Sequence, residues 1–156
     1  MSLRSQFNGS YDYTIIGNTH NVGNVALNSA PPCQMTTSSS AMLNLAPNQN
    51  IVKAYLYWFG PGDGTFDPLI NFNGLNYTAL ELSVAQLGSS TQEAYYGAFV
   101  DVTNEVIIAG NVLYSFSSFD LNPILPAYCS SASNYSGWHM VVVYEEQGLP
   151  NTQLNV

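Results

Sequence analysis

The residues of this chain that could do chemistry are few, and the first are two aspartates in one loop. Asp63 and Asp67 lie in a segment rich in glycine and proline, where carboxylates and backbone carbonyls could supply oxygen ligands for calcium. The segment lacks the alternating acids and the distal Glu of an EF-hand loop, and Gly-Asp-Gly is also an ordinary turn sequence. Calcium at Asp63 and Asp67 is therefore a hypothesis that competes with a simple turn.

The histidines and the paired glutamates do not form a catalytic set. His139 lies in an apolar segment, where we expect it to be packed or hydrogen-bonded, and His20 has no Cys or acid pattern near it. A zinc site needs three or four protein ligands, and no GxSxG nucleophile motif occurs. Glu145 and Glu146 are adjacent, so on a strand they point to opposite faces and cannot flank one substrate. We expect no enzymatic activity.

Tyrosine is the more informative residue type, with eleven in the chain. We take Tyr55, Tyr57, Tyr95 and Tyr96 as candidate ligand-binding residues, because tyrosine rings beside asparagine amides suit sugars. The competing interpretation is that an outward tyrosine is a normal strand former. The expected partners are glycans or other surface proteins.

Charge is scarce in this chain and excludes several classes of partner. Arg4 and Lys53 are the only basic residues against ten acids, and 8% of residues are charged, compared with about a quarter in ordinary soluble domains. Two cations cannot form the basic patch that nucleic acid requires, and anionic membrane surfaces are disfavoured for the same reason. No apolar run is long enough to span a membrane. A domain kept soluble by amides and hydroxyls suits an extracellular location.

Two cysteines, Cys33 and Cys129, are far apart in the sequence, so they cannot form a CxxC element. Both lie in segments rich in proline or serine, where a covalent link between loops is useful. In an oxidising compartment we expect them to form a disulfide that closes a long loop. The alternative is a pair of buried free thiols.

The pattern along the chain predicts an all-β fold, a β-sandwich that is jelly-roll-like and has one short helix near residues 101–109. Alternation in 51–59 sends Val52, Ala54, Leu56 and Trp58 to the core, and Asn73-Gly74 predicts a type I′ hairpin turn. The predicted strands cover 11–16, 40–45, 51–59, 69–72, 75–82, 94–100, 111–119 and 138–144. We expect residues 1–10 to be a tag or a disordered start. Residues 11–156 are predicted to form a single sandwich domain, or the first half of a longer one.

Five segments carry a resemblance to a known family; their sequences are YTIIGNT, SAMLNL, VKAYLYW, YYGAFVDVT and GWHMVVVYE. In that order they resemble the N-terminal β-domain of large secreted surface proteins of Bacteroidetes, which are often called gliding-motility-associated or adhesin-like and are exported by type IX secretion. The resemblance spans residues 11–156. It implies an exported, adhesive role and gives no functional residues to carry over.

These observations together predict a non-catalytic extracellular module, structural or adhesive, of a bacterial cell-surface protein. One alternative is a carbohydrate-binding module, with calcium assisting. A second is a subunit that self-associates and polymerises by strand addition, because residues 151–156 read as a strand that could belong to an incomplete sheet.

Overall fold

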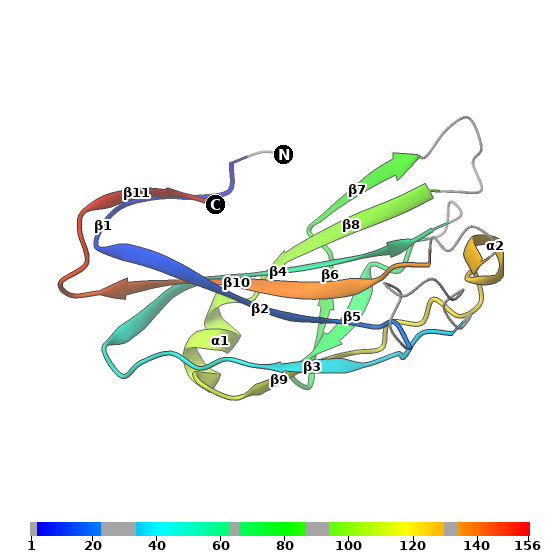
Figure 1. Cartoon of the computed structure of the whole chain (residues 1–156), viewed down its shortest axis with the longest axis horizontal. Helices are drawn as coiled ribbons and strands as arrows, with labels where there is room; N and C mark the ends of the chain where they lie inside the picture. The colour runs from blue at the N-terminus through cyan, green and yellow to red at the C-terminus, as the bar shows by residue number, and fades with distance from the viewer. Residues whose placement is uncertain (1–2, 23–33, 63–65, 87–93, 130–133) are drawn as a thin grey trace.

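The computed structural model describes residues 3–22, 34–62, 66–86, 94–129 and 134–156. Two antiparallel sheets pack face to face (Figure 1). The five-stranded sheet has the order β2 (Tyr11–Thr19), β10 (Gly137–Glu146), β4 (Gln49–Pro61), β8 (Ala94–Asp101) and β7 (Glu81–Gln86). The four-stranded sheet has the order β3 (Ser39–Met42), β9 (Leu113–Ser117), β5 (Leu69–Phe72) and β6 (Leu75–Thr78).

The strand order confirms the predicted jelly-roll-like sandwich. With β7 set aside, the sheets are β2-β10-β4-β8 and β3-β9-β5-β6. With β7 set aside, the chain crosses from one sheet to the other at every connection except β5–β6, as in a jelly roll built from two Greek keys. Strand β7 is an addition to this pattern, and it extends the first sheet beyond β8.

The core lies between the two sheets, where the alternation of the sequence places it. Ala54, Leu56 and Trp58 on β4 are fully buried, as the pattern predicted. They meet the buried rings of β9, and Phe116 stacks on Trp138 of β10 with ring centroids 5.7 Å apart. Strands from the two sheets thus bury their inward residues against one another.

The hairpin at Asn73-Gly74 is confirmed, but the strand predicted after it is wrong. Asn73 and Gly74 have φ angles of 51° and 87°, as a type I′ turn requires. Instead of one strand over 75–82, β6 ends at Thr78 and β7 begins at Glu81. The break has a backbone cause: Ala79 N donates to Pro68 O, whereas Leu80 N donates to Phe99 O on the other sheet. The chain changes sheets between these two residues.

The helix expected near 101–109 is confirmed as α1 (Thr103–Ala109). Its Val106 side chain is fully buried, and Gly110, with a φ of 62°, ends the helix. A second, short helix, α2 (Pro126–Cys129), was not predicted, because the proline and serine content of 120–137 favoured a loop. Proline is well suited to the first helical position, since its missing N–H would have no partner there.

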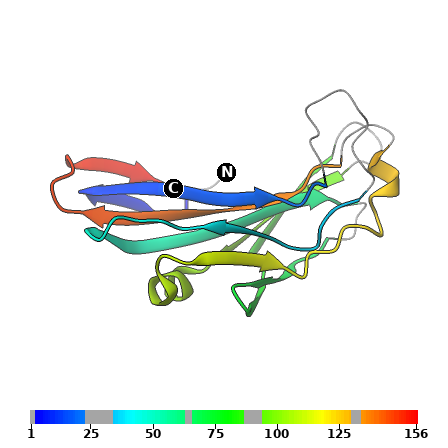
Figure 2. The same ribbon diagram turned by 60° about the horizontal axis from the view of Figure 1, so that its bottom comes forward.

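The two ends of the described chain meet in a separate ribbon, in which β1 (Gln6–Gly9) pairs with β11 (Thr152–Asn155). Figure 2 shows this ribbon on the side of the five-stranded sheet away from α1. Within the start that was expected to be a tag or disordered, Gln6–Gly9 form a strand. The strand expected near 151–156 is β11.

Cys129 ends α2, but Cys33 lies outside the described residues, so the disulfide remains a prediction.

Candidate functional site

A row of aromatic rings crosses the face of the five-stranded sheet that points away from the core, which we call the outer face. Tyr57 on β4 lies opposite His139 on β10 and opposite Phe99 on β8. The Tyr57 and His139 rings stack with centroids 5.0 Å apart and planes inclined by 13°. The Tyr57 and Phe99 centroids are 5.1 Å apart. The three strands thus carry one continuous row of rings, in which Phe99 is only 7% exposed because Arg4 lies over it.

The next row on the same face has a single aromatic side chain between two glycines. Phe59 on β4 lies opposite Gly137 on β10 and opposite Gly97 on β8, and 41% of its surface is exposed. Because neither neighbour has a side chain, a hollow lies on each side of the ring. The hollow over Gly97 has a volume of about 220 Å³. The hollow on the Gly137 side has a volume of about 360 Å³. We call Phe59 with these two hollows the trough.

The glycines along the trough are there for different reasons. A Cβ added to Gly17, which lies opposite His139, would be 2.3 Å from Trp138 O, so close backbone packing excludes a side chain. A Cβ on Gly137 would be 3.0 Å from Asn18 O, which is also tight. A Cβ on Gly97 would meet no atom within 4 Å. Packing does not require glycine at 97, and a strand glycine that packing does not require often marks the close approach of a ligand.

Polar groups gather at the β7 side of the trough. Arg4 Nη1 lies 2.5 Å from Glu81 Oε1, and its guanidinium carbon lies 3.5 Å from the centroid of the Phe99 ring. The Glu81 carboxylate raises the pKa of Arg4, and Arg4 in turn lowers the pKa of Glu81. Burial lowers the pKa of His139, which favours its neutral imidazole. The hollow over Gly97 therefore combines aromatic walls with a neutral ring and a charged pair at its edge.

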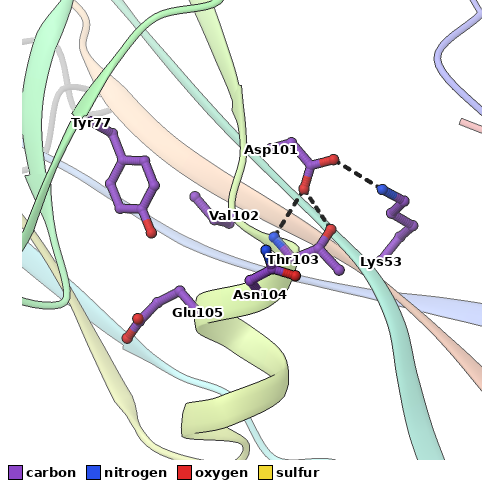
Figure 3. Close-up of a pocket in the computed structure, with 7 residues that line it drawn as sticks. All are labelled: Lys53, Tyr77, Asp101, Val102, Thr103, Asn104 and Glu105. Carbon is purple, nitrogen blue, oxygen red and sulfur yellow. Dashed lines mark hydrogen bonds and ion pairs between the residues drawn. The ribbon is translucent and has the colours of Figure 1, made fainter.

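A second concave region lies where β8 leads into α1 (Figure 3). Asp101 accepts hydrogen bonds there from Lys53 Nζ at 3.0 Å and from Thr103 N at 2.9 Å. Burial of Asp101 opposes its ionisation, but the bonds from Thr103 and Lys53 outweigh it and lower the pKa. Tyr77 and Glu105 face the same space in Figure 3. The Asp101 carboxylate is satisfied within the chain and holds the start of a seven-residue helix, which accounts for this cluster without a ligand.

The four tyrosines predicted as ligand-binding residues are not brought together. Tyr57 lines the trough. Tyr55, on the same face, is 3% exposed, and its hydroxyl bonds to Ser5 Oγ. Tyr95 is half-buried, and Tyr96 is a core residue that is 2% exposed, with its hydroxyl against the backbone of Asp67. As the structure stands, Tyr96 offers no surface to a ligand.

Sequence reasoning missed the other trough residues, although signals for two of them were present. Phe59 continues the outward alternation of Tyr55 and Tyr57 along the same strand. Gly97 interrupts a strand that is otherwise aromatic and aliphatic. The expectation that His139 is packed is confirmed by its stacking on Tyr57.

The candidate calcium loop is described only in part. Asp63 lies outside the described residues. Asp67 Oδ1 accepts a hydrogen bond from Leu69 N at 3.2 Å, and burial, with the nearby Asp120 charge, raises the pKa of Asp67. Within the described part of the chain, His, Cys, Asp and Glu side chains form no group of three or more suited to a metal ion. Calcium at Asp63 and Asp67 stays a prediction.

No protein-family model, curated protein or solved structure matches this chain. The resemblance to secreted Bacteroidetes surface proteins therefore remains an expectation from the sequence. In the ranges that the structure describes, no helix has both the length and the apolar character needed to cross a bilayer.

Proposed function

We propose that this chain is a non-catalytic adhesive module of an exported bacterial surface protein and that it contacts saccharides through the trough. The observation that carries the proposal is the exposed Phe59 ring, which stands between two glycines with a hollow on each side. The trough lies on rigid strands, which hold a binding surface more firmly than loops do.

Saccharide chemistry suits this surface for two reasons. The C–H face of a pyranose ring is apolar and gains from packing against an aromatic ring such as Phe59 or Tyr57. The sugar hydroxyls need donors and acceptors at the rim, and Arg4, Glu81 and Ser83 provide both at the hollow over Gly97. A ligand that meets aromatic and hydrogen-bonding groups together is held in one orientation.

The extracellular part of the proposal rests on composition. The two cations of the chain are both held in ion pairs on or beside the outer face, Arg4 with Glu81 and Lys53 with Asp101. A surface that relies on tyrosine, asparagine and serine for solubility suits an oxidising environment, where the predicted link between Cys33 and Cys129 would also form.

The test is a glycan array probed with the purified chain and with the variant Gly97→Leu. The leucine side chain projects into the hollow, and its Cβ meets no atom within 4 Å. We expect the wild type to bind one sugar class and Gly97→Leu to lose at least about tenfold in affinity, equivalent to about 1.4 kcal/mol. Ser115→Leu, at an exposed position on the other sheet, is the matched control and should bind normally.

The array is run with calcium and again with chelator. Binding that disappears with chelator supports a calcium site at Asp63 and Asp67. Unchanged binding indicates that the trough binds the sugar without calcium. A blank array with protein shown to be folded contradicts the saccharide proposal and favours a structural surface module.

A further inference from the structure

Among the residues that the structure describes, β7 is an edge of the five-stranded sheet with no strand on its outer side (Figure 1). It pairs with β8 on one side, and all six of its residues, Glu81–Gln86, are exposed. An edge strand presents a row of backbone N–H and C=O groups that can pair with another extended chain. At the opposite edge, by contrast, β2 lies beside β3, and Asn18 Nδ2 donates to Ser40 O at 3.0 Å.

Natural edge strands usually carry features that prevent such pairing, and β7 has few of them. Within Glu81–Gln86 there is no lysine, arginine or proline, and the pairing with β8 runs without a register shift. The one charged residue is Glu81, and Arg4 neutralises it within the same chain. The edge is therefore regular and carries no net charge, although the whole chain carries −8.

Apolar side chains are exposed along the same edge. Leu80, Leu82 and Val84 are 69%, 37% and 47% exposed. Leu82 and Val84 lie opposite Ala98 and Tyr96 of β8, which are buried, so both point to the core side of the sheet. The second sheet does not extend far enough to cover them. A strand added at this edge would bury part of this apolar surface.

We infer that β7 pairs antiparallel with β7 of a second copy of this chain. The sequence of β7 is self-complementary for this purpose. With a two-fold axis at Ser83, Leu82 of each copy lies opposite Val84 of the other, and Glu81 lies opposite Ala85. Residues of the same face are thus matched, and no like charges face each other. The contact is isologous and closes after two copies.

This dimer has a consequence for the outer face. A two-fold axis perpendicular to the sheet keeps the outer faces of both copies on the same side of one continuous sheet. Glu81 and Ser83 border the hollow over Gly97, so the two hollows lie on either side of the shared seam. Two sites on one face would raise avidity for a repetitive ligand. That consequence rests on the proposed function, whereas the dimer itself does not.

The first test is the mass of the protein in solution without ligand, measured by analytical ultracentrifugation over a range of concentrations. We expect a monomer–dimer equilibrium with a Kd below about 1 mM. Val84→Lys places a charge on the exposed core side of the edge and should raise Kd at least about tenfold. Ile108→Lys is the matched control, because Ile108 is 84% exposed on α1, far from β7 in the fold, and this variant should dimerise normally.

The second test uses the predicted two-fold axis. In Ser83→Cys the two new thiols lie opposite each other, and mild oxidation should link two copies. Ser115→Cys, on an exposed position of β9, should not cross-link at the same rate. A wild type that stays monomeric at about 1 mM, or equal behaviour of the β7 variants and their controls, overturns the inference. Because no sugar is present, these results are independent of the array.

Discussion

Tyr57 and His139 come from distant parts of the sequence, and their rings stack with centroids 5.0 Å apart on neighbouring strands. The contact is a direct result of register, because β4 and β10 pair these two residues opposite one another. Phe99 extends the row onto β8. The trough therefore lies beside rings that support each other, and its shape does not depend on a mobile loop.

The first prediction concerns this stack and needs no ligand. Tyr57→Ala, His139→Ala and the double variant form a double-mutant cycle, measured by denaturant unfolding. Aromatic pairs at this distance contribute about 0.5–1.5 kcal/mol beyond burial, so we expect a coupling free energy of that size. Additive effects of the two substitutions would show that the rings do not stabilise each other.

The second prediction compares two glycines on the same face of the same sheet. Gly17→Ala forces a Cβ to within 2.3 Å of Trp138 O and 2.8 Å of His139 Cα, both backbone atoms. We expect the free energy of unfolding to fall by about 1–3 kcal/mol, as in other overpacked sites. Gly97→Ala meets open space and removes a flexible residue from a strand, so it should stabilise by about 0.4–1 kcal/mol.

Chemical denaturation of both alanine variants in parallel with the wild type measures this difference. The pair is informative because the substitution is the same and only the surroundings of the Cβ differ. Equal losses of unfolding free energy at the two positions would mean that the space over Gly97 is not open in solution. That result would contradict the trough as a binding surface.

The third prediction concerns His20, which is fully buried between the rings of Phe116 and Phe119, with centroids 5.3 Å away in each case. Its Nε2 lies 3.4 Å from Ser39 Oγ, and burial lowers the pKa of His20 to about 4 from an ordinary value of 6.5. The unfolded chain therefore binds this proton more readily than the folded chain. Stability from His20 is fully present above about pH 6.5 and is lost as the pH falls toward 4, by about 3 kcal/mol in total.

Unfolding free energies measured between pH 7 and pH 4 test this expectation. His20→Phe cannot titrate and should lose much of the decline in this range. His139 contributes in the same direction, because burial lowers its pKa as well, so some slope should remain. If wild type and His20→Phe decline in parallel, burial does not lower the pKa of His20 as expected.

The fold follows from local patterns to a large extent. Alternation placed Trp58 in the core, Asn73-Gly74 formed the expected turn, and Gly110 ended the expected helix. Each of these depends on near neighbours in the sequence. The break at 79–80 could not be predicted in the same way, because alternation continues through it and the cause is a hydrogen bond from Leu80 to Phe99 on the other sheet.

The candidate site was harder to predict, because it depends on how β4 aligns with its neighbouring strands β10 and β8. That Tyr57 points outward follows from its own strand, whereas its contact with His139 depends on how β10 aligns with β4. The isolation of Phe59 likewise requires two glycines on two other strands to lie opposite it. Tyr96 was misjudged for a different reason: its position in the alternation of β8 faces the core, which the pattern of one strand can indicate. One sequence gives the parity within a strand but not the alignment between strands.

The last prediction concerns Cys33 and Cys129. Cys129 ends α2, and its Sγ lies 3.1 Å from Leu125 O, beside the core residue Tyr128. A link to Cys33 would close a loop of roughly 100 residues and stabilise the folded state by about 5 kcal/mol in the chain-entropy treatment. The double variant Cys33→Ser/Cys129→Ser should therefore have a lower Tm than the wild type, by scanning calorimetry. Reductant should lower the wild-type Tm to the same value and leave the variant unchanged. Two thiols that react with a maleimide in the unfolded, unreduced wild type would instead establish free cysteines.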